Sequence, residues 1–122
     1  MFIIDHTART PIYEQIKSQM LSLISSGAIK PGDKLPSIRT LAVQLNLNVN
    51  TIKKVFAQLE ADGVIVTVVG SGSYVAETAY RNPNIMEKAE QQLRDALKTA
   101  KSAGLKQAEI LAIVNEFDKE DD

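Results

Sequence analysis

Apolar residues recur every three or four positions in the segment that follows Thr10 and Pro11. A threonine before a helix and a proline at its first position both favour helix initiation. The chain then meets Gly27, a residue type that commonly ends helices, so the spacing predicts a helix over about residues 11–26. Its apolar face consists of Ile12, Ile16, Met20, Leu23 and Ile24.

Two shorter helical patterns follow, separated only by residues 46–48. Ser37 can cap the first, which is about nine residues long, and Asn48 can cap the second, which should end at Gly63. The second has an apolar face made of Ile52, Val55, Phe56 and Leu59. Two short helices joined by a tight break predict a helix-turn-helix, in which the second helix crosses the first and projects from the domain.

After these helices the pattern becomes that of strands. Residues 64–69 are rich in β-branched side chains, the run Gly70-Ser71-Gly72 follows, and residues 73–75 form a second short segment. This order predicts a β-hairpin whose glycines adopt positive φ at the tip. A helix-turn-helix followed by a hairpin is a winged helix, in which one helix enters the DNA major groove and the wing reaches the flanking backbone.

Helical spacing returns after Pro83 and breaks at Gly104, so the C-terminal segment is predicted to be a pair of helices that ends in an acidic tail. The predicted fold is therefore mainly α with a small β-hairpin. A winged helix-turn-helix domain with an extended N-terminal segment occupies residues 1–78, and a two-helix dimerisation domain occupies residues 79–122.

The helical pair contains more large apolar side chains than an isolated two-helix hairpin can bury. Packing against a second copy of the chain would cover them, and this is the preferred interpretation. Packing against the first helix of the same chain is the alternative. The predicted dimer interface consists of Leu93, Leu97, Ile110, Ile113, Val114 and Phe117.

Composition narrows the classes of function. The chain has no cysteine, which excludes disulfides, thiolate catalysis and cysteine-ligated metals. His6 is the only histidine and has no serine or cysteine partner in a recognisable catalytic arrangement. We therefore expect no enzyme activity, no catalytic residue, no metal site and no cofactor. No run approaches the roughly 20 apolar residues that cross a bilayer, so the expected location is the cytoplasm, with no membrane partner.

Charge is distributed unevenly along the chain. Residues 1–76 hold seven Lys or Arg against five Asp or Glu, a balance of +2, whereas residues 77–122 hold seven against ten, a balance of −3. Opposite the apolar stripe of the third helix lie Asn50, Lys53, Lys54 and Ala57, with no acid among them. The lysines can neutralise phosphates, and the asparagine can pair with an adenine edge. A merely solvated helix face is the alternative interpretation.

Five blocks of sequence, in order and with the expected gaps, resemble the N-terminal domain of the GntR family of bacterial transcription regulators. They are Pro11-Ile12-Tyr13-Glu14-Gln15-Ile16, the stretch from Gly27 to Ala42, Asn48-Val49-Asn50-Thr51-Ile52, the stretch from Leu59 to Ile65, and Gly70-Ser71-Gly72-Ser73-Tyr74-Val75. The resemblance implies a homodimer that binds inverted-repeat operators in double-stranded DNA. The short C-terminal segment resembles the small YtrA-like branch, in which the helical pair mainly dimerises.

The family's phosphate and base contacts, as the resemblance implies, fall on Arg39, Asn48, Asn50, Thr51 and Lys53, with Gly70 at the wing tip. Val49 stands where some branches carry an arginine that reads guanine, so that contact is not expected here; the valine can instead touch a thymine methyl. With the residues chosen from the helix face and the wing, the predicted DNA-binding set is Arg39, Asn48, Val49, Asn50, Thr51, Lys53, Lys54, Gly70, Ser71 and Gly72.

The predicted function is thus a sequence-specific DNA-binding transcriptional regulator, with repression as the expected sense. A small-molecule effector is an open element of this prediction. The alternative is a winged-helix module for protein–protein interaction that has only non-specific affinity for DNA.

Overall fold

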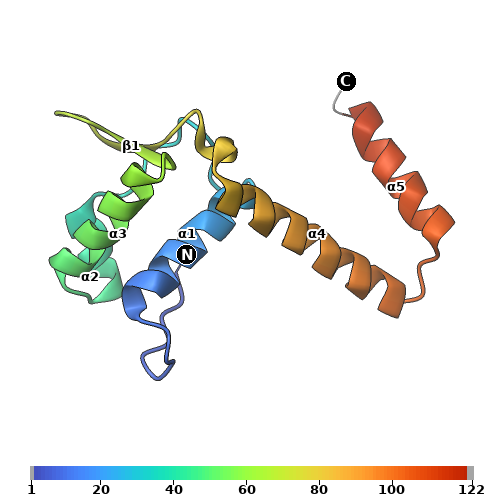
Figure 1. Cartoon of the computed structure of the whole chain (residues 1–122), viewed down its shortest axis with the longest axis horizontal. Helices are drawn as coiled ribbons and strands as arrows, with labels where there is room; N and C mark the ends of the chain where they lie inside the picture. Colours follow the sequence, from blue (N-terminus) through green and yellow to red (C-terminus); the bar gives the residue numbers. More distant parts are fainter. Residues whose placement is uncertain (1, 121–122) are drawn as a thin grey trace. The chain divides into compact units, whose positions relative to one another are not determined.

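The computed structural model describes residues 2–120 of the 122-residue chain and divides into two compact units, Met1–Ala89 and Glu90–Asp122. The predicted fold class is confirmed, since helices and one two-stranded hairpin make up the described structure (Figure 1). The elements in order are α1 (Ile12–Ser25), α2 (Ile38–Leu45), α3 (Val49–Ala61), β1 (Ile65–Val68), β2 (Gly72–Val75), the 3-10 helix η1 (Ala79–Arg81), α4 (Pro83–Ser102) and α5 (Gln107–Glu120).

The caps that define α2 and α3 are those that the sequence predicts. The Ser37 side chain accepts a hydrogen bond from the Thr40 N–H (3.0 Å), and Asn48 Oδ1 accepts one from the Asn50 N–H (2.8 Å). Asn46 lies between the helices in the left-handed region at φ 53°, a conformation that asparagine tolerates. The helix-turn-helix is therefore built from local side-chain-to-backbone bonds.

Helix α1 begins one residue later than predicted. Pro11 occupies the capping position with extended geometry (φ −54°, ψ 149°), and its carbonyl accepts the first bonds, from the N–H groups of Glu14 and Gln15 (both 3.1 Å). Thr10 therefore does not cap the helix. Its carbonyl accepts a hydrogen bond from Gln15 Nε2 (2.9 Å).

Two glutamine side chains of α1 tie down the N-terminal segment. Gln19 exchanges hydrogen bonds with the backbone of Ile3 (2.8 and 2.6 Å), and Gln15 does the same with Asp5 (both 2.9 Å). Each amide side chain thus serves one donor and one acceptor of the same backbone residue, as a neighbouring strand would, and Gln15 also donates to Thr10. The predicted extended segment is held against the helix rather than left loose.

The hairpin carries a third extended segment at its edge. Strands β1 and β2 pair antiparallel, with Ile65 opposite Val75 and Val68 opposite Gly72. On the other side of β2, the connector between α1 and α2 pairs through the Leu35 N–H to the Ser73 carbonyl (2.8 Å) and the Val75 N–H to the Asp33 carbonyl (2.9 Å). This connector is therefore part of the wing's base.

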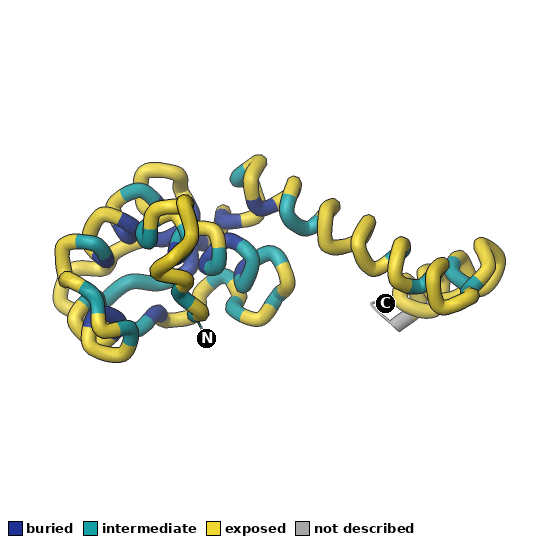
Figure 2. The backbone as a smooth tube through the Cα atoms, turned by 90° about the horizontal axis from the view of Figure 1, so that it is seen from below, coloured by how far each residue is buried: buried dark blue, intermediate teal, exposed yellow. Residues whose placement is uncertain are grey.

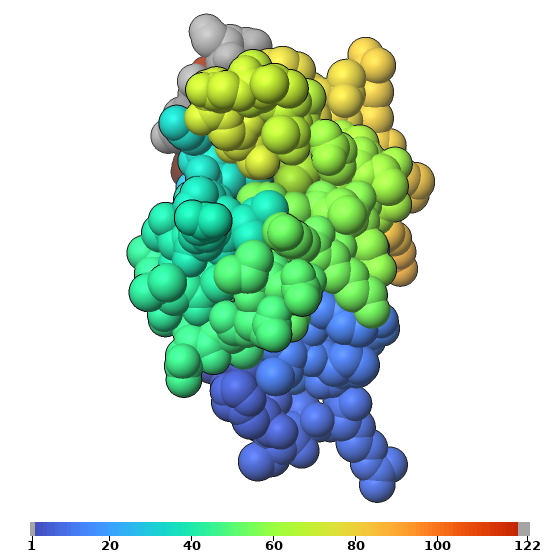
Figure 3. All heavy atoms as spheres, turned by 90° about the vertical axis from the view of Figure 1, so that its left-hand side faces the viewer, coloured from blue at the N-terminus to red at the C-terminus, as the bar shows by residue number. Residues whose placement is uncertain are grey.

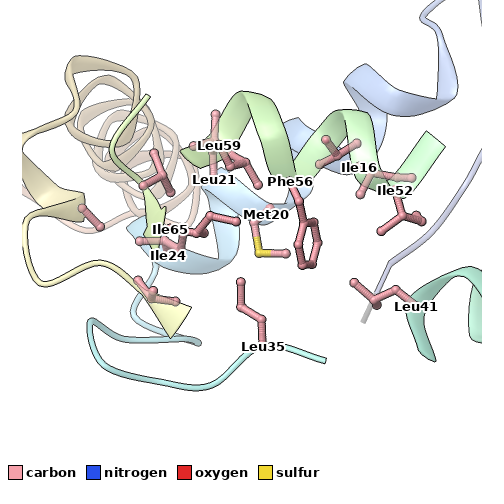
Figure 4. Packing of buried hydrophobic residues seen from close by; sticks show 14 of the residues in the cluster. Ile16, Met20, Leu21, Ile24, Leu35, Leu41, Ile52, Phe56, Leu59 and Ile65 are labelled. Atoms are coloured by element: carbon pink, nitrogen blue, oxygen red, sulfur yellow. The ribbon is translucent and has the colours of Figure 1, made fainter. Parts of the chain in front are cut away.

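The core of the first unit joins α1, α2, α3 and the hairpin. Figure 4 shows Met20 and Ile24 of α1 facing Phe56 and Leu59 of α3, with Leu35 and Leu41 closing the cluster. The whole cluster of buried residues is Ile16, Met20, Leu21, Ile24, Leu35, Leu41, Ala42, Ile52, Val55, Phe56, Leu59, Val64, Ile65, Val75, Ala79 and Ile85. The predicted apolar face of α3 is thus buried, which leaves its opposite face for solvent or ligand.

The predicted boundary near residue 78 differs from the observed division after Ala89. The physical reason is the first turn of α4: Ile85 is fully buried and belongs to the core cluster, as does Ala79 of η1. The start of α4 is therefore an integral part of the winged-helix unit.

The core can be tested at Leu59. We expect Leu59→Ala to lower the free energy of unfolding by about 2–5 kcal/mol, because a fully buried leucine loses both its transfer energy and its packing. Val43→Ala removes an apolar side chain that is 81% exposed and should change stability by about 0.5 kcal/mol or less. Urea unfolding of both variants measures the difference. Equal shifts would contradict this assignment of the core.

The second unit consists of the rest of α4 and of α5. Between the helices, the Leu105 N–H donates to the Ala100 carbonyl (3.0 Å), and Glu109 Oε1 accepts from the Lys106 N–H (3.2 Å). Helix α5 extends to Glu120 and so includes part of the predicted acidic tail. The acidic tail was predicted to follow it; its last residues, Asp121 and Asp122, lie outside the described residues.

Candidate nucleic-acid interface

One face of the first unit brings α2, α3 and the wing together. Figure 3 shows α2 and α3 side by side in green, with the hairpin above them and the connector in cyan next to it. Helix α3 packs on both α1 and α2 through its buried stripe. Its other side is open, so the predicted recognition residues lie on an accessible surface.

The first turn of α3 presents three exposed residues and one half-buried residue. Asn48, Val49 and Asn50 are exposed, and Thr51 is half-buried. The Oδ1 atom of Asn48 is used by the helix cap, so its amide nitrogen is the group that can donate to a phosphate. The amide of Asn50 and the methyl groups of Val49 point from the same turn, where they can meet base edges.

The stretch of sequence that contains this turn is positively charged. Lys34, Arg39, Lys53 and Lys54 are the only charged residues between positions 34 and 59, a stretch without an acid. Arg39 and Lys53 are both exposed, and within the described part of the chain no carboxylate pairs with either. The charge on this part of the face is therefore available to an anionic partner.

The acids nearest to the first turn of α3 in sequence, Glu60 and Asp62, are at the opposite end of this helix. Glu60 Oε1 accepts a hydrogen bond from the Thr67 N–H (3.3 Å), and Asp62 Oδ2 lies 3.1 Å from Lys17 Nζ. Both carboxylates are thus engaged near the C-terminal end of the helix. The only charged residues in the N-terminal half of α3 are lysines. Positive charge therefore lies toward the start of the helix and negative charge toward its end.

Lys53 and Lys54 differ, although the sequence predicts the same role for both. The Lys54 ammonium lies 3.7 Å from the centroid of the Tyr13 ring, a cation–π contact between α3 and the start of α1. Such a contact stabilises an exposed pair by about 0.5–1 kcal/mol. It restricts the Lys54 side chain toward α1, whereas Lys53 makes no cation–π contact or ion pair with any described residue.

The wing tip is uncharged and glycine-rich. Gly70 and Gly72 have φ values of 80° and 139°, as predicted for the turn, and Val69 beside them is 98% exposed. The Ser71 hydroxyl is hydrogen-bonded to the Tyr74 hydroxyl, which braces the tip against β2. The Ser71 N–H donates to the Val68 carbonyl (3.0 Å), so a phosphate contact would use the Gly70 N–H or this shared hydroxyl pair.

Sequence reasoning missed Lys34. A Cβ at Gly72 would lie 3.1 Å from Lys34 Cε, so the lysine side chain lies directly against the wing. The sequence offered a partial signal, since Lys34 is a base within the predicted connector. Its place beside the wing depends on the pairing of the connector with β2, which the local pattern does not show.

The predicted dimer residues all belong to the second unit. Leu93, Ile113, Val114 and Phe117 are exposed, while Leu97 and Ile110 are half-buried. Figure 2 shows that most residues of both helices in this unit are exposed. None of the described helices combines the length and the apolar content that crossing a membrane requires.

Taken together, the fold and this face define a winged helix-turn-helix regulator of the DNA-binding class. The family described as "Bacterial regulatory proteins, gntR family" matches residues 12–75, and the chain belongs to this family. The predicted resemblance is thus confirmed. The members of this family are regulators of transcription rather than enzymes.

Relatives and solved structures agree with this assignment. The HTH-type transcriptional repressor YtrA of Bacillus subtilis (strain 168) is 49% identical over 79 residues, which cover 65% of this chain and 61% of YtrA. The HTH-type transcriptional regulator YhcF of the same strain is 33% identical over 108 residues, covering 88% of this chain and 89% of YhcF. The chain thus spans less than two thirds of YtrA but most of YhcF.

Two solved structures bear on the whole chain and on the interface. YtrA from Sulfolobus acidocaldarius, a GntR-family transcription factor, has a TM-score of 0.57 at 37% identity and covers 98% of this chain and 97% of its own. AraR(DBD) in complex with operator ORX1 has a TM-score of 0.56 at 29% identity, covering 62% of this chain and 95% of its own. The second is a similar domain seen on DNA.

Proposed function

We propose that this chain is a transcriptional repressor that binds an inverted-repeat operator as a homodimer in the cytoplasm, where its DNA partner lies. The observation that carries the proposal is the exposed, acid-free N-terminal half of α3, which lies beside α2 and the wing on one face. A helix of this kind fits the major groove of B-form DNA. The structure of the similar AraR(DBD) in complex with operator ORX1 supports a DNA-binding role for this domain.

The residues divide into two roles. Arg39, Lys53, Lys54 and the wing contact phosphates, because their charges and N–H groups match the backbone and carry no base information. Asn50 and Val49 contact base edges, because an amide pairs with adenine and a valine packs on a thymine methyl. Asn48 and Thr51 position the helix end on the backbone.

Dimerisation is proposed through the second unit. Its exposed apolar side chains on α4 and α5 match a two-fold interface in which the same patch serves both copies. Two recognition helices would then enter successive major grooves, roughly 34 Å apart along the duplex. A small-molecule effector, if the chain takes one, would act by changing this spacing, since both half-sites must be reached together.

Binding experiments separate this function from that of a protein-interaction module. The proposed repressor binds a duplex selected from a random pool at least about 1,000-fold more tightly than a scrambled duplex at physiological salt. An interaction module would bind both duplexes weakly and alike, since its affinity would come from phosphates alone. Fluorescence anisotropy with the two duplexes measures the ratio, and a ratio near one would refute sequence-specific regulation.

Asn50 is expected to set base preference. We expect Asn50→Ala to change the preferred base at one position of each half-site, because loss of an amide-to-base pair costs about 1–3 kcal/mol of discrimination. Selection from a randomised duplex pool, run on parent and variant, reads the preference directly. Asn115→Ala on α5 is the matched control and should select the parental site. An unchanged preference in Asn50→Ala would assign this residue to the backbone instead.

A further inference from the structure

The wing has no positive charge of its own. From Ile65 to Val75 the chain contains neither lysine nor arginine, and the tip consists of Val69, Gly70 and Ser71. A wing that follows the DNA backbone gains most of its affinity by neutralising phosphates. The hairpin can therefore contribute this attraction to phosphates only if another element places a cation beside it.

The connector between α1 and α2 brings a lysine to this position. Lys34 forms a backbone bridge opposite Tyr74, on the free edge of β2. Alternate residues of a strand share a face, so Gly72 lies on the same face as Tyr74 and one step nearer the tip. The Lys34 side chain extends along this face: Cε lies 3.1 Å and Nζ 3.9 Å from the position that a Cβ of Gly72 would occupy.

Gly72 leaves the space that the lysine stem uses. A side chain at this position would require Lys34 to move, and the φ of 139° already disfavours one. Beside it, the hydrogen bond between the Ser71 and Tyr74 hydroxyls holds the aromatic side chain along the same strand. The tip is thus shaped so that the stem of Lys34 lies against it.

No acid among the described residues neutralises the Lys34 ammonium. Asp33 Oδ2, next in the chain, accepts a hydrogen bond from the Lys30 N–H (2.8 Å). Glu77 lies against the turn at Gly32, with Oε1 3.1 Å from the position of a Cβ there. Lys34 is exposed, so a ligand can reach it.

We propose that Lys34 is the phosphate-binding residue of the wing. It belongs to the connector, and its side chain lies along the hairpin in the space that Gly72 leaves open. Its partner is a backbone phosphate that flanks each half-site. This inference rests on the proposed DNA-binding function and adds one contact per protomer to it. Gly72 is a positioning residue that acts through Lys34.

Neutralising Lys34 tests the contact. We expect Lys34→Gln to reduce the slope of log affinity against log salt by about 1.8 per dimer, since two phosphate contacts are lost. Affinity near physiological salt should fall roughly 10- to 30-fold, and by the same factor on selected and scrambled duplexes, because phosphates carry no sequence information. Lys34→Arg should retain the slope. Lys30→Gln removes the same charge from the same connector and should leave the slope near that of the parent.

A double-mutant cycle tests the role of Gly72. We expect Gly72→Ala to weaken DNA binding in the parent and to add little to Lys34→Gln, since both changes remove one contact. Additive losses would overturn the positioning role. A Lys34→Gln slope equal to that of the parent, with Arg39→Ala still weakening the same duplex, would overturn this inference alone. If the parent itself fails to distinguish selected from scrambled DNA, the proposed function fails instead.

Discussion

Operator affinity is expected to fall at least 100-fold when Val114 and Phe117 are both replaced by aspartate. The two side chains lie on the apolar side of α5 and are 44% and 62% exposed, so their replacement costs the monomer little. Across a two-fold axis the four new carboxylates would face one another and repel. A monomer then binds each half-site separately and loses the effective concentration, of about millimolar order, that links the two sites in a dimer.

Sedimentation and anisotropy on one preparation check this prediction. The matched control is the pair Ala112→Asp and Asn115→Asp, which adds the same charge to the opposite side of α5, given about 100° per residue. The control should stay dimeric and bind as the parent does. A dimer that survives Val114→Asp with Phe117→Asp would place the interface elsewhere. Truncation after residue 78 is a poorer test, because it removes Ile85 from the core.

The second large effect is a loss of DNA affinity when Arg39 of α2 and Lys53 of α3 are both replaced. Arg39→Ala combined with Lys53→Ala removes four phosphate contacts from a dimer, which should lower the salt slope by about 3 to 4 and the affinity at physiological salt by at least about 100-fold. Scrambled and selected duplexes should lose affinity alike, since these contacts position the protein without reading bases. Both side chains are exposed, so the fold should persist.

The control for this pair removes the same charge from α4. Lys98 and Lys101 are exposed and belong to the second unit, whereas α3 and the wing belong to the first. Lys98→Ala with Lys101→Ala should change the salt slope by less than about one unit. An equal loss in both double variants would show that net charge, rather than this face, governs DNA binding.

Local signals explain why most elements could be predicted. The caps at Ser37 and Asn48 and the stop at Gly63 are bonds or backbone angles within a few residues, and the structure shows each of them. The apolar stripe of α3 is likewise a property of one helix, and its four residues are buried. Sequence patterns therefore predicted the winged helix and the exposed side of its recognition helix.

Contacts between distant segments could not be predicted in this way. The predicted boundary near residue 78 differs from the observed division because Ile85 reaches a core assembled from six earlier elements. The difference between Lys53 and Lys54 depends on Tyr13, which lies on another helix. Lys34 reaches the wing only because the connector pairs with β2. Each case depends on tertiary packing, which spacing along the chain does not record.

The most direct test of the account is the position of α3 on DNA. Because the chain has no cysteine, Ala57→Cys on the outer side of α3 provides a single site for an iron chelate, whose radicals cut nearby deoxyribose. On the selected operator we predict two groups of cuts, one in each half-site, about 10 base pairs apart. The same chelate at Ser102→Cys on α4 should give no such pattern. Absence of cuts from position 57, or identical cuts from both positions, would contradict the claim that this helix enters the major groove.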